Sequence, residues 1–312
     1  MITDRLHEDS LKLLSSYKDV QFDYLPEISR DELSNIIKEY DGLIVRSRTK
    51  VTREILERGK KLKVIVRAGS GLDNIDVDAA HELNIRVMNV PETVANAVAE
   101  LTIGLIIMLS RKLYKAVESL KRGEWIKNQL VGYELRDKKM GIVGVGNVGR
   151  RVAELASAFN MKLLLNDIVE IEEEFIKKVN GEVVDLRSLL RESDYVSLHI
   201  PLNKSTKRMI GEAELKLMKK TAFLINTARA EIVDTEVLYR ALIEKWIAGA
   251  ALDVYEVEPP TDLKLLKLEN VICTPHIGAQ TEESGRRASI EAIKLASRYL
   301  LEEVYQSKVR VE

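Results

Sequence analysis

The feature that most constrains the fold is a glycine-rich segment at residues 141–150, which reads Gly-Ile-Val-Gly-Val-Gly-Asn-Val-Gly-Arg. It holds the pattern Gly-x-Gly-x-x-Gly directly after an apolar strand and directly before a segment with helical spacing, which is the context that a dinucleotide-binding loop needs. Gly144 permits the tight turn, Gly146 lets a pyrophosphate approach the backbone, and Gly149 lets the helix pack against the strand. The segment predicts a nucleotide-binding βαβ unit.

An acidic residue downstream strengthens this interpretation. Asp167 ends the next apolar strand, 18 residues after Gly149, and the ribose-binding acid of such units follows at about 20 residues. Its carboxylate would accept bonds from the ribose hydroxyls and repel a 2′-phosphate, and the two apolar residues that follow offer no cation. The sequence therefore predicts NAD rather than NADP, with the amides near Asn147 and Val148 facing the phosphates. An exposed acid that merely ends a strand is the alternative.

Apolar strands alternate with helix-like segments along most of the chain, which predicts parallel sheets covered by helices. In the first ninety residues the predicted strands are 21–25, 42–46, 62–66 and 85–90, and a very short one at 1–3 would complete a five-stranded sheet. From residue 139 onward they are 139–143, 162–166, 195–199, 222–226, 249–253 and 271–274. A helix over 93–113 is apolar nearly all round and should be covered on both faces.

Composition excludes several classes of protein. The net charge is −1, with charges of both signs spread along the chain, so neither nucleic acid nor an anionic membrane is an expected partner. The single cysteine, Cys273, rules out an internal disulfide framework and suits a reducing cytoplasm. The N-terminus shows no secretory signal, and the most apolar run, 101–109, is shorter than the ~20 residues that span a bilayer. We expect a cytoplasmic protein.

Three chemically active side chains follow three strands of the second series. Arg229 follows strand 222–226, Glu258 follows strand 249–253, and His276 follows strand 271–274. Parallel strands deliver such residues to one edge of the sheet, where ligands bind. An arginine can hold a carboxylate, a histidine can exchange a hydroxyl proton, and a glutamate can orient the imidazole. Taken singly, each is more readily explained as a surface ion pair, a loop charge or a packed turn.

The remaining three histidines are more simply explained by structural roles than by catalysis. His7 and His81 lie on helix-like segments, where surface or packing roles are the simpler explanation. His199 ends a strand just before Pro201 and could border a cofactor, although a structural role is simpler. No cluster has metal-ligand spacing, so no metal site is expected.

The sequence resembles the D-2-hydroxyacid dehydrogenases over essentially its whole length. Six stretches match in order: VRAGSGLDNID, GIVGVGNVGR, LHIPLNKST, LINTARAEIVD, GAALDVYEVEPP and TPHIGAQT. The catalytic Arg, Glu and His of the family fall on Arg229, Glu258 and His276. The resemblance implies the following cofactor-binding set: Ser70, Gly144, Gly146, Asn147, Val148, Gly149, Asp167, His199, Ile200, Pro201, Thr227, Ala228, Arg229, Asp253, His276 and Gly278.

The resemblance also implies the domain organisation. It predicts an α/β fold of two doubly wound parallel-sheet domains, in which a Rossmann NAD-binding domain, 92–279, is inserted into a flavodoxin-like substrate domain, 1–91 plus 280–312. The family's cleft between the domains holds the substrate. Its members are dimers joined through the nucleotide-binding domain, so the resemblance implies a homodimer for this chain, with a dimer of dimers as the alternative. Nothing follows the closing helix, so a short form without an appended regulatory domain is expected, while the chain's natural start before Met1 is left open.

Within the family the chain resembles most the 3-phosphoglycerate dehydrogenases, which serve serine synthesis. By that resemblance Arg46 and Arg67 contact the substrate phosphate, Ser47 lies beside them, and Lys127 reaches across from the other subunit. The Ser70–Gly71 turn presents amides to the substrate carboxylate, together with Arg229 and His276. Arginines that merely pair with neighbouring acids are the alternative for Arg46 and Arg67.

Two further readings and one departure remain. A glyoxylate or hydroxypyruvate reductase would use the same catalytic groups, and an NAD(H)-sensing binding protein would share the fold without the reaction. Where the family usually has Arg-Gly, this chain has Arg229-Ala230. If that glycine has a positive φ, the alanine carries a steric cost.

Overall fold

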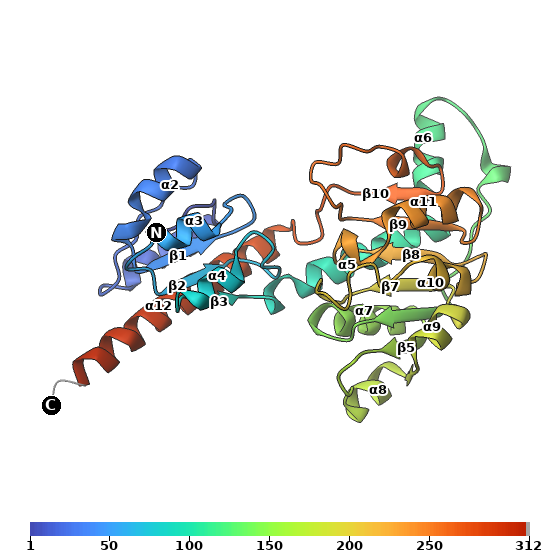
Figure 1. Cartoon of the computed structure of the whole chain (residues 1–312). Coiled ribbons are helices and arrows are strands. Elements are labelled where there is room, and N and C mark those ends of the chain that lie inside the picture. The colour runs from blue at the N-terminus through green and yellow to red at the C-terminus, as the bar shows by residue number, and fades with distance from the viewer. Residues whose placement is uncertain (310–312) are drawn as a thin grey trace. The chain divides into compact units, whose positions relative to one another are not determined.

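The computed structural model describes residues 1–309 and divides into two compact units (Figure 1). Unit 1 comprises Met1–Val94 and Ala279–Glu312, and unit 2 comprises Ala95–Gly278. The sequence placed the two boundaries at 91/92 and 279/280. The last three residues of the predicted substrate domain, 310–312, lie outside the described residues.

Unit 2 is built on a seven-stranded sheet in the order β10-β9-β8-β7-β4-β5-β6, in which every neighbouring pair is parallel. This arrangement confirms the predicted α/β class. The strands are β4 (Lys139–Val143), β5 (Lys162–Asn166), β6 (Gly181–Val183), β7 (Tyr195–Leu198), β8 (Phe223–Asn226), β9 (Gly249–Leu252) and β10 (Val271–Cys273). Strand β6 was not predicted, because two of its three residues are exposed and give no apolar signal.

Helices cover both faces of this sheet. The helices of unit 2 are α5 (Glu92–Ser110), α6 (Leu113–Lys121), α7 (Asn147–Ala158), α8 (Glu173–Val179), α9 (Leu186–Glu192), α10 (Glu212–Leu217) and α11 (Thr235–Ile243). Successive residues of β5 alternate between the two cores: Leu163 and Leu165 pack with α5 and α7, whereas Leu164 packs with α9, α10 and α11. A strand buried on both faces reads as a continuous apolar run, which is why these strands were recognised from sequence.

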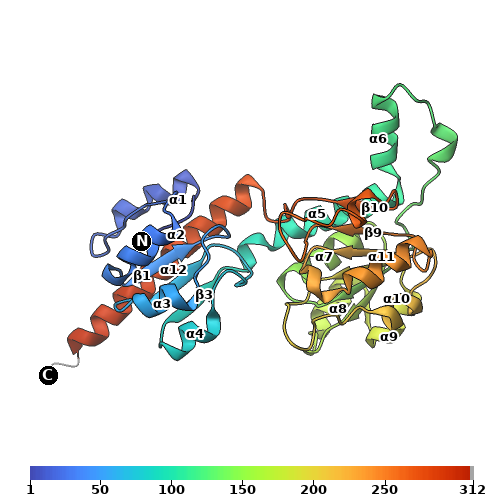
Figure 2. The same cartoon turned by 45° about the horizontal axis from the view of Figure 1, so that its top comes forward.

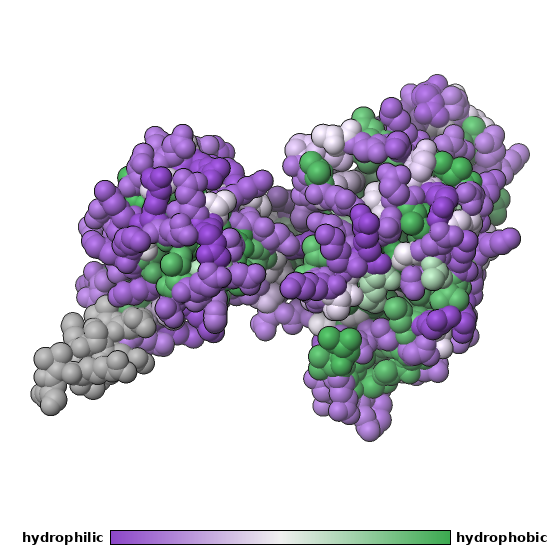
Figure 3. All heavy atoms as spheres, in the orientation of Figure 1, coloured by the Kyte–Doolittle hydropathy of each residue, from purple (hydrophilic) through white to green (hydrophobic). Residues whose placement is uncertain are grey.

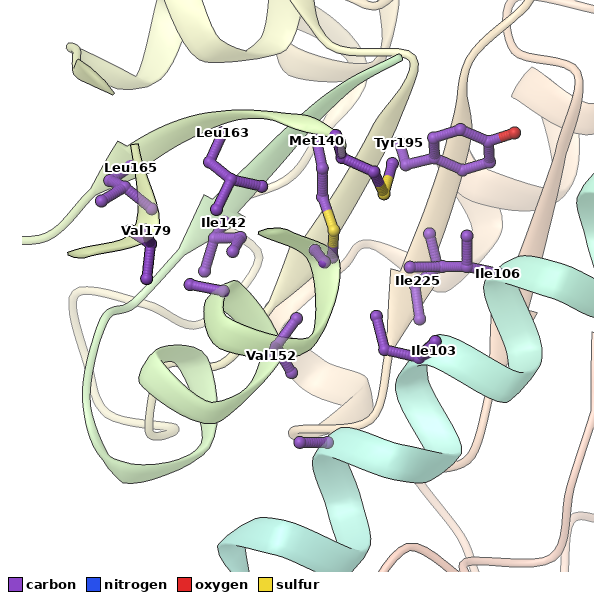
Figure 4. Packing of buried hydrophobic residues seen from close by; sticks show 14 of the residues in the cluster. Ile103, Ile106, Met140, Ile142, Val152, Leu163, Leu165, Val179, Tyr195 and Ile225 are labelled. Atoms are coloured by element: carbon purple, nitrogen blue, oxygen red, sulfur yellow. The ribbon is translucent and has the colours of Figure 1, made fainter. Parts of the chain in front are cut away.

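Helix α5 is the most apolar helix of the chain. Among the described residues it alone is long and apolar enough to cross a membrane, by length and composition only, yet 61% of that stretch is buried within the protein. Ile103 and Ile106 pack against the sheet beside Ile225 and Tyr195 (Figure 4). The predicted single helix over 93–113 is wrong at its end, because Lys112 adopts a left-handed conformation (φ 51°) and starts α6 as a separate helix.

Unit 1 holds a three-stranded parallel sheet of β1 (Gly42–Val45), β2 (Val64–Arg67) and β3 (Arg86–Asn89). The predicted strands 1–3 and 21–25 are reduced to single bridges, in which Ile2 pairs with Tyr24 and with Ile44. Ile2 is fully buried, so the apolar pattern reports burial here rather than an extended ladder. The helices are α1 (Glu8–Lys12), α2 (Arg30–Ile36), α3 (Arg53–Arg58), α4 (Val77–Glu82) and α12 (Glu282–Val309).

The closing helix α12 packs on the sheet of unit 1, as expected. Ala292, Ile293 and Ala296 lie in one buried cluster with Ile44 and Val66, and both views show α12 running along β1 and β2 (Figures 1 and 2). Small residues on this face of α12 let it approach the strands closely. The C-terminal segment thus belongs to the same unit as the N-terminal ninety residues.

Candidate active site

The loop after β4 has the geometry that its glycines predict. Gly144 has φ +91°, and a Cβ there would lie 2.7 Å from the carbonyl oxygen of His199. At Gly149 a Cβ would lie 1.9 Å from the carbonyl oxygen of Gly144. Both positions therefore exclude any side chain, the first through conformation and the second through close packing of α7 on the loop.

The start of α7 offers the space that a pyrophosphate needs. Gly146 is the N-cap residue, no side chain caps the helix, and a Cβ at Gly146 would meet no atom within 4 Å. Helix α7 thus presents its first backbone amides, near Asn147 and Val148, to an open space, where the helix dipole favours an anion. The residues present fit a dinucleotide phosphate.

Asp167 follows β5 and turns back toward this loop. Its carboxylate accepts the backbone N–H of Val145 at 2.6 Å and that of Val169 at 3.0 Å. These two hydrogen bonds from backbone amides fix the carboxylate beside the glycine loop, where a ribose attached to the bound phosphates would lie. Ile168 is fully exposed next to it, and no cation follows, which fits NAD better than NADP.

Arg229 lies in the loop after β8, in extended backbone conformation (φ −145°, ψ 139°). The buried side chain of Asn226 bridges this loop, accepting the N–H of Ala228 at 3.1 Å and donating to the carbonyl oxygen of Arg229 at 2.8 Å. Thr227 is nearly buried, and its hydroxyl lies 3.1 Å from that of Thr102 on α5. The sequence did not single out Asn226, although asparagine at a strand end is a common turn signal.

The backbone conformation of Ala230 shows whether alanine is strained at the position where the family usually has glycine. It begins a single 3₁₀ turn, Ala230–Ile232, is 9% exposed, and is not among the residues with positive φ. The predicted conformational cost does not arise, because a right-handed turn accepts alanine without strain.

His276 and Glu258 form a hydrogen-bonded pair. The Nδ1 atom of His276 lies 2.9 Å and 2.8 Å from the two carboxylate oxygens of Glu258. The carboxylate fixes the ring, assigns the proton to Nδ1 and leaves Nε2 for an exchangeable proton of a ligand. Both side chains are partly exposed, His276 to 47% and Glu258 to 40%, so solvent-borne molecules can reach them.

A buried carboxylate builds the turn that carries His276. Asp253, 1% exposed, accepts the Thr274 hydroxyl at 2.6 Å and the backbone N–H groups of Ile277 and Gly278 at 2.9 and 2.8 Å. His276 sits between these anchors with φ +51°, an uncommon conformation for a side-chain-bearing residue. The structure thus shows Asp253 bonding this turn, a role that the prediction of a cofactor-lining residue did not include.

Comparison with known proteins agrees with this geometry. The model of the D-isomer specific 2-hydroxyacid dehydrogenase, NAD binding domain, matches residues 103–278. A hydroxypyruvate reductase of Thermotoga maritima is 44% identical over 94% of this chain and 95% of its own length. The chain belongs to the D-isomer specific 2-hydroxyacid dehydrogenase family.

Two further similarities bear on the substrate and the fold. A D-3-phosphoglycerate dehydrogenase of Methanocaldococcus jannaschii is 42% identical over the whole of this chain, which spans only 59% of that protein's length. The structure of D-lactate dehydrogenase from Aquifex aeolicus, complexed with NAD and lactic acid, superposes with a TM-score of 0.86 at 32% identity, covering 98% of this chain and 97% of that one. NAD is therefore the cofactor of this dehydrogenase family member.

His199, Ile200 and Pro201, predicted from the family to border NAD, follow β7 next to the glycine loop. Ile200 lies against Gly144, and the carbonyl of Pro201 accepts the Thr206 hydroxyl at 2.7 Å. The His199 ring bonds Ser197 through Nε2 at 2.8 Å, and burial lowers the pKa of His199 to about 3. The imidazole is thus neutral at physiological pH. Its placement in the cofactor set stays a prediction.

The family's substrate residues in unit 1 follow β1 and β2. Arg46 donates from its guanidinium to the carbonyl oxygen of Arg5 at 3.3 Å, and Ser47 is exposed. The Arg67 guanidinium lies over Gly69, where a Cβ would be 2.4 Å from Nη1. Ser70 accepts the side-chain amide of Asn89 through its carbonyl oxygen, and Gly71 is partly exposed beside it.

Lys127 lies in unit 2, in a short 3₁₀ turn (Lys127–Gln129) that follows α6, and it is exposed. Its predicted role across a subunit boundary stays a prediction. Among residues 1–309, no group of three or more His, Cys, Asp or Glu side chains is placed to hold a metal ion.

Sequence reasoning missed the groups that hold the site together. Tyr255 donates its hydroxyl to the carbonyl of Thr274 at 2.9 Å and its backbone N–H to Glu258 at 3.3 Å, so it joins the two loops that carry the His–Glu pair. Burial raises the pKa of Tyr255, with the neighbouring Cys273 acting in the same direction, so the phenol keeps its proton. In unit 1, Asp4 plays a comparable part for the Arg46 loop.

Proposed function

We propose that this protein oxidises D-3-phosphoglycerate to 3-phosphohydroxypyruvate with NAD, the reaction that opens serine synthesis. The observation that carries the proposal is the His276–Glu258 pair at the strand edge that also presents Arg229 and the dinucleotide loop. This combination supplies what hydride transfer at a 2-hydroxy acid needs: a carboxylate anchor, a proton acceptor and a cofactor site.

The chemistry follows from the side chains. When bound, NAD supplies the acceptor for the hydride that leaves C2. Arg229 holds the substrate carboxylate through charge-assisted hydrogen bonds, and Nε2 of His276 takes the hydroxyl proton as the carbonyl forms. Glu258 at Nδ1 compensates the positive charge that the ring acquires. In the reverse direction Nε2 returns the proton to the carbonyl oxygen.

The phosphate preference rests on Arg46. In the described part of the chain no carboxylate pairs with its guanidinium, whereas the nearby Arg48 pairs with Asp4 at 3.1 Å. An arginine at a strand end without an acidic partner supports a role in anion binding. The second candidate is a hydroxypyruvate reductase, favoured by the relative from Thermotoga maritima that matches over 95% of its length.

The deciding experiment measures NAD reduction with D-3-phosphoglycerate, D-glycerate and D-lactate, and NADH oxidation with hydroxypyruvate and glyoxylate. A higher kcat/KM for the phosphorylated acid supports the proposal. Comparable or higher kcat/KM for the unphosphorylated acids makes the reductase the correct function. If NADH binds and no acid reacts in either direction, the protein is an NAD(H)-sensing binding protein.

Arg46→Ala tests the phosphate contact. Removing one charge-assisted bond costs about 2 kcal/mol, or roughly 30-fold in kcat/KM for D-3-phosphoglycerate, while D-glycerate should be spared. Arg53→Ala is the matched control, since Arg53 pairs with Glu82 on the surface of the same unit. Equal losses on both acids would show that Arg46 has a structural role.

We further propose that the protein is a homodimer joined through unit 2. Helix α6 and the segment after it stand away from the sheet of unit 2 (Figure 2). They expose Val117 to 52%, Leu120 to 62%, Trp125 to 81% and Val131 to 75%, an apolar surface larger than isolated exposed residues would make. The face seen in Figure 3 likewise shows hydrophobic residues exposed over unit 2. Light scattering should give a dimer for the wild type and a monomer for Leu120→Glu.

A further inference from the structure

The loop that carries Arg229 depends on one buried side chain. Asn226 is 1% exposed, and it uses both ends of its amide on this loop, accepting from the N–H of Ala228 and donating to the carbonyl oxygen of Arg229. These two bonds span the residues on either side of the Ala228–Arg229 peptide. They therefore fix the direction in which the Arg229 side chain leaves the backbone.

A pocket lies beside the two residues that flank this loop, Asn226 and Ala230. This pocket of about 290 Å³ in unit 2 is lined by Asn226, Ala230 and Tyr255, among others. Where a loop borders a pocket, no close-packed core opposes its movement into that space. Hydrogen bonds therefore contribute to the restraint on this loop. Besides the two bonds of Asn226, the Arg229 guanidinium donates to the carbonyl oxygen of Ala228 at 2.6 Å, and the Thr227 hydroxyl lies 3.1 Å from that of Thr102.

We propose that Asn226 is a positioning residue for Arg229: its amide holds the loop so that the guanidinium meets the substrate carboxylate. The inference rests on the proposed function, because it assigns the carboxylate to Arg229. Asn226 touches the loop backbone rather than the substrate, so its effect is transmitted through Arg229. Small displacements of such an anchor are costly, since a shift of about 1 Å can lower a rate about 100-fold.

The chain offers a matched control. Asn270 directly precedes β10 and so lies at the amino ends of the strands, whereas Arg229 follows the carboxyl end of β8. The side-chain amide of Asn270 donates to the carbonyl oxygens of Leu242 and Ala248 at 3.5 and 3.2 Å. It is thus an asparagine that braces loops in the same way but far along the strands from Arg229. Asn270→Ala reports what losing such a brace does to the unit as a whole.

The test compares Asn226→Ala, Asn226→Asp and Asn270→Ala in the full chain. We expect Asn226→Ala to lower kcat/KM for the 2-hydroxy acid by about 30- to 100-fold, with the Kd for NADH within about twofold of the wild type. Asn226→Asp keeps the acceptor for Ala228 but loses the donor to Arg229, so it should not rescue. Asn270→Ala should keep kcat/KM within about threefold.

A double-mutant cycle decides whether Asn226 acts through Arg229. In an Arg229→Lys background, Asn226→Ala should cost less than about threefold further. If the two losses multiply, or if Asn270→Ala lowers kcat/KM as much as Asn226→Ala, the positioning role is wrong.

Amide hydrogen exchange separates this proposal from the proposed function. Asn226→Ala should speed exchange over residues 227–230 and leave the turn at 276–278 unchanged, whether or not any hydroxy acid reacts. If the wild type reacts with none of the acids, the proposed function fails, while selective loss of protection at 227–230 still supports the brace. Unchanged exchange there overturns the positioning role.

Discussion

The two units hold their functional loops in similar ways but with different donors. In unit 2, the buried carboxylate of Asp253 accepts the Thr274 hydroxyl and two backbone N–H groups around His276. In unit 1, the buried carboxylate of Asp4 accepts the backbone N–H of Arg46 and both the hydroxyl, at 2.7 Å, and the N–H of Thr49. Asp4 is 2% exposed and Asp253 is 1% exposed.

The difference lies in charge. The donors to Asp253 are neutral, whereas Asp4 also pairs with Arg48, whose side chain is 48% exposed. A buried carboxylate without a cation depends on correctly placed dipoles, because it loses its hydration and regains it only through hydrogen bonds. The turn at His276 is therefore expected to be the less tolerant of the two, and the loop at Arg46 the more sensitive to salt.

The largest expected effect is that of Asp253→Asn. The amide group of asparagine would face backbone N–H donors, leaving at least one buried donor unpaired at a cost of about 1–3 kcal/mol in unfolding free energy. Displacement of the His276 turn should also lower kcat about 100-fold. Urea unfolding and steady-state kinetics measure both. A variant with wild-type kcat would show that the turn holds its shape without Asp253.

Asp4→Asn should have a smaller effect on activity. The Arg46 loop loses its carboxylate, so KM for the phosphorylated acid should rise about tenfold, while the Kd for NADH, whose candidate site lies in unit 2, stays unchanged. Because Arg48 is half exposed, its pairing with Asp4 is screened by salt. The wild type, unlike the variant, should lose part of its unfolding free energy between low and high ionic strength. Equal salt dependence of the two proteins would contradict the proposed distinction between the loops.

The last prediction concerns the pH dependence of stability rather than activity, and it rests on His199, whose partly buried imidazole is neutral at physiological pH. Burial lowers its pKa from 6.5 to about 3, so between these values the unfolded chain binds a proton that the folded chain does not. The contribution of His199 to the unfolding free energy is present above pH 6.5 and is lost, by at most about 1.4 kcal/mol per pH unit, as pH falls toward 3. His199→Gln should therefore reduce the slope of unfolding free energy against pH between pH 6.5 and 3.

His81→Gln is the control, since His81 is exposed on α4. The slope of unfolding free energy against pH measured for this variant is the reference for His199→Gln. Identical slopes for His199→Gln and the wild type would mean that His199 can be protonated in the folded state.

Local sequence patterns were enough to locate the dinucleotide loop and most strands of unit 2. The glycine pattern after β4 located the dinucleotide loop because conformation and close contact both exclude side chains at Gly144 and Gly149. The strands of unit 2 were found within one residue at each end, apart from β6, because burial on both faces makes each an apolar run. The prediction failed at 21–25, where the partly buried Phe22 and Tyr24 alternate with exposed residues as in a strand, but the segment forms a single bridge through Tyr24.

Only the tertiary structure decided what holds the candidate site in place. Asp4 meets Thr49 across 45 residues of chain, and Asp253 meets Gly278 across 25, so no local pattern relates the partners. Strand order brings them together at the carboxyl edge of each sheet, and the cost of burying a carboxylate then makes its hydrogen bonds specific. The sequence shows which side chains can carry the chemistry, and the folded chain determines which neighbours orient them, because hydrogen bonds depend on distance and direction in space.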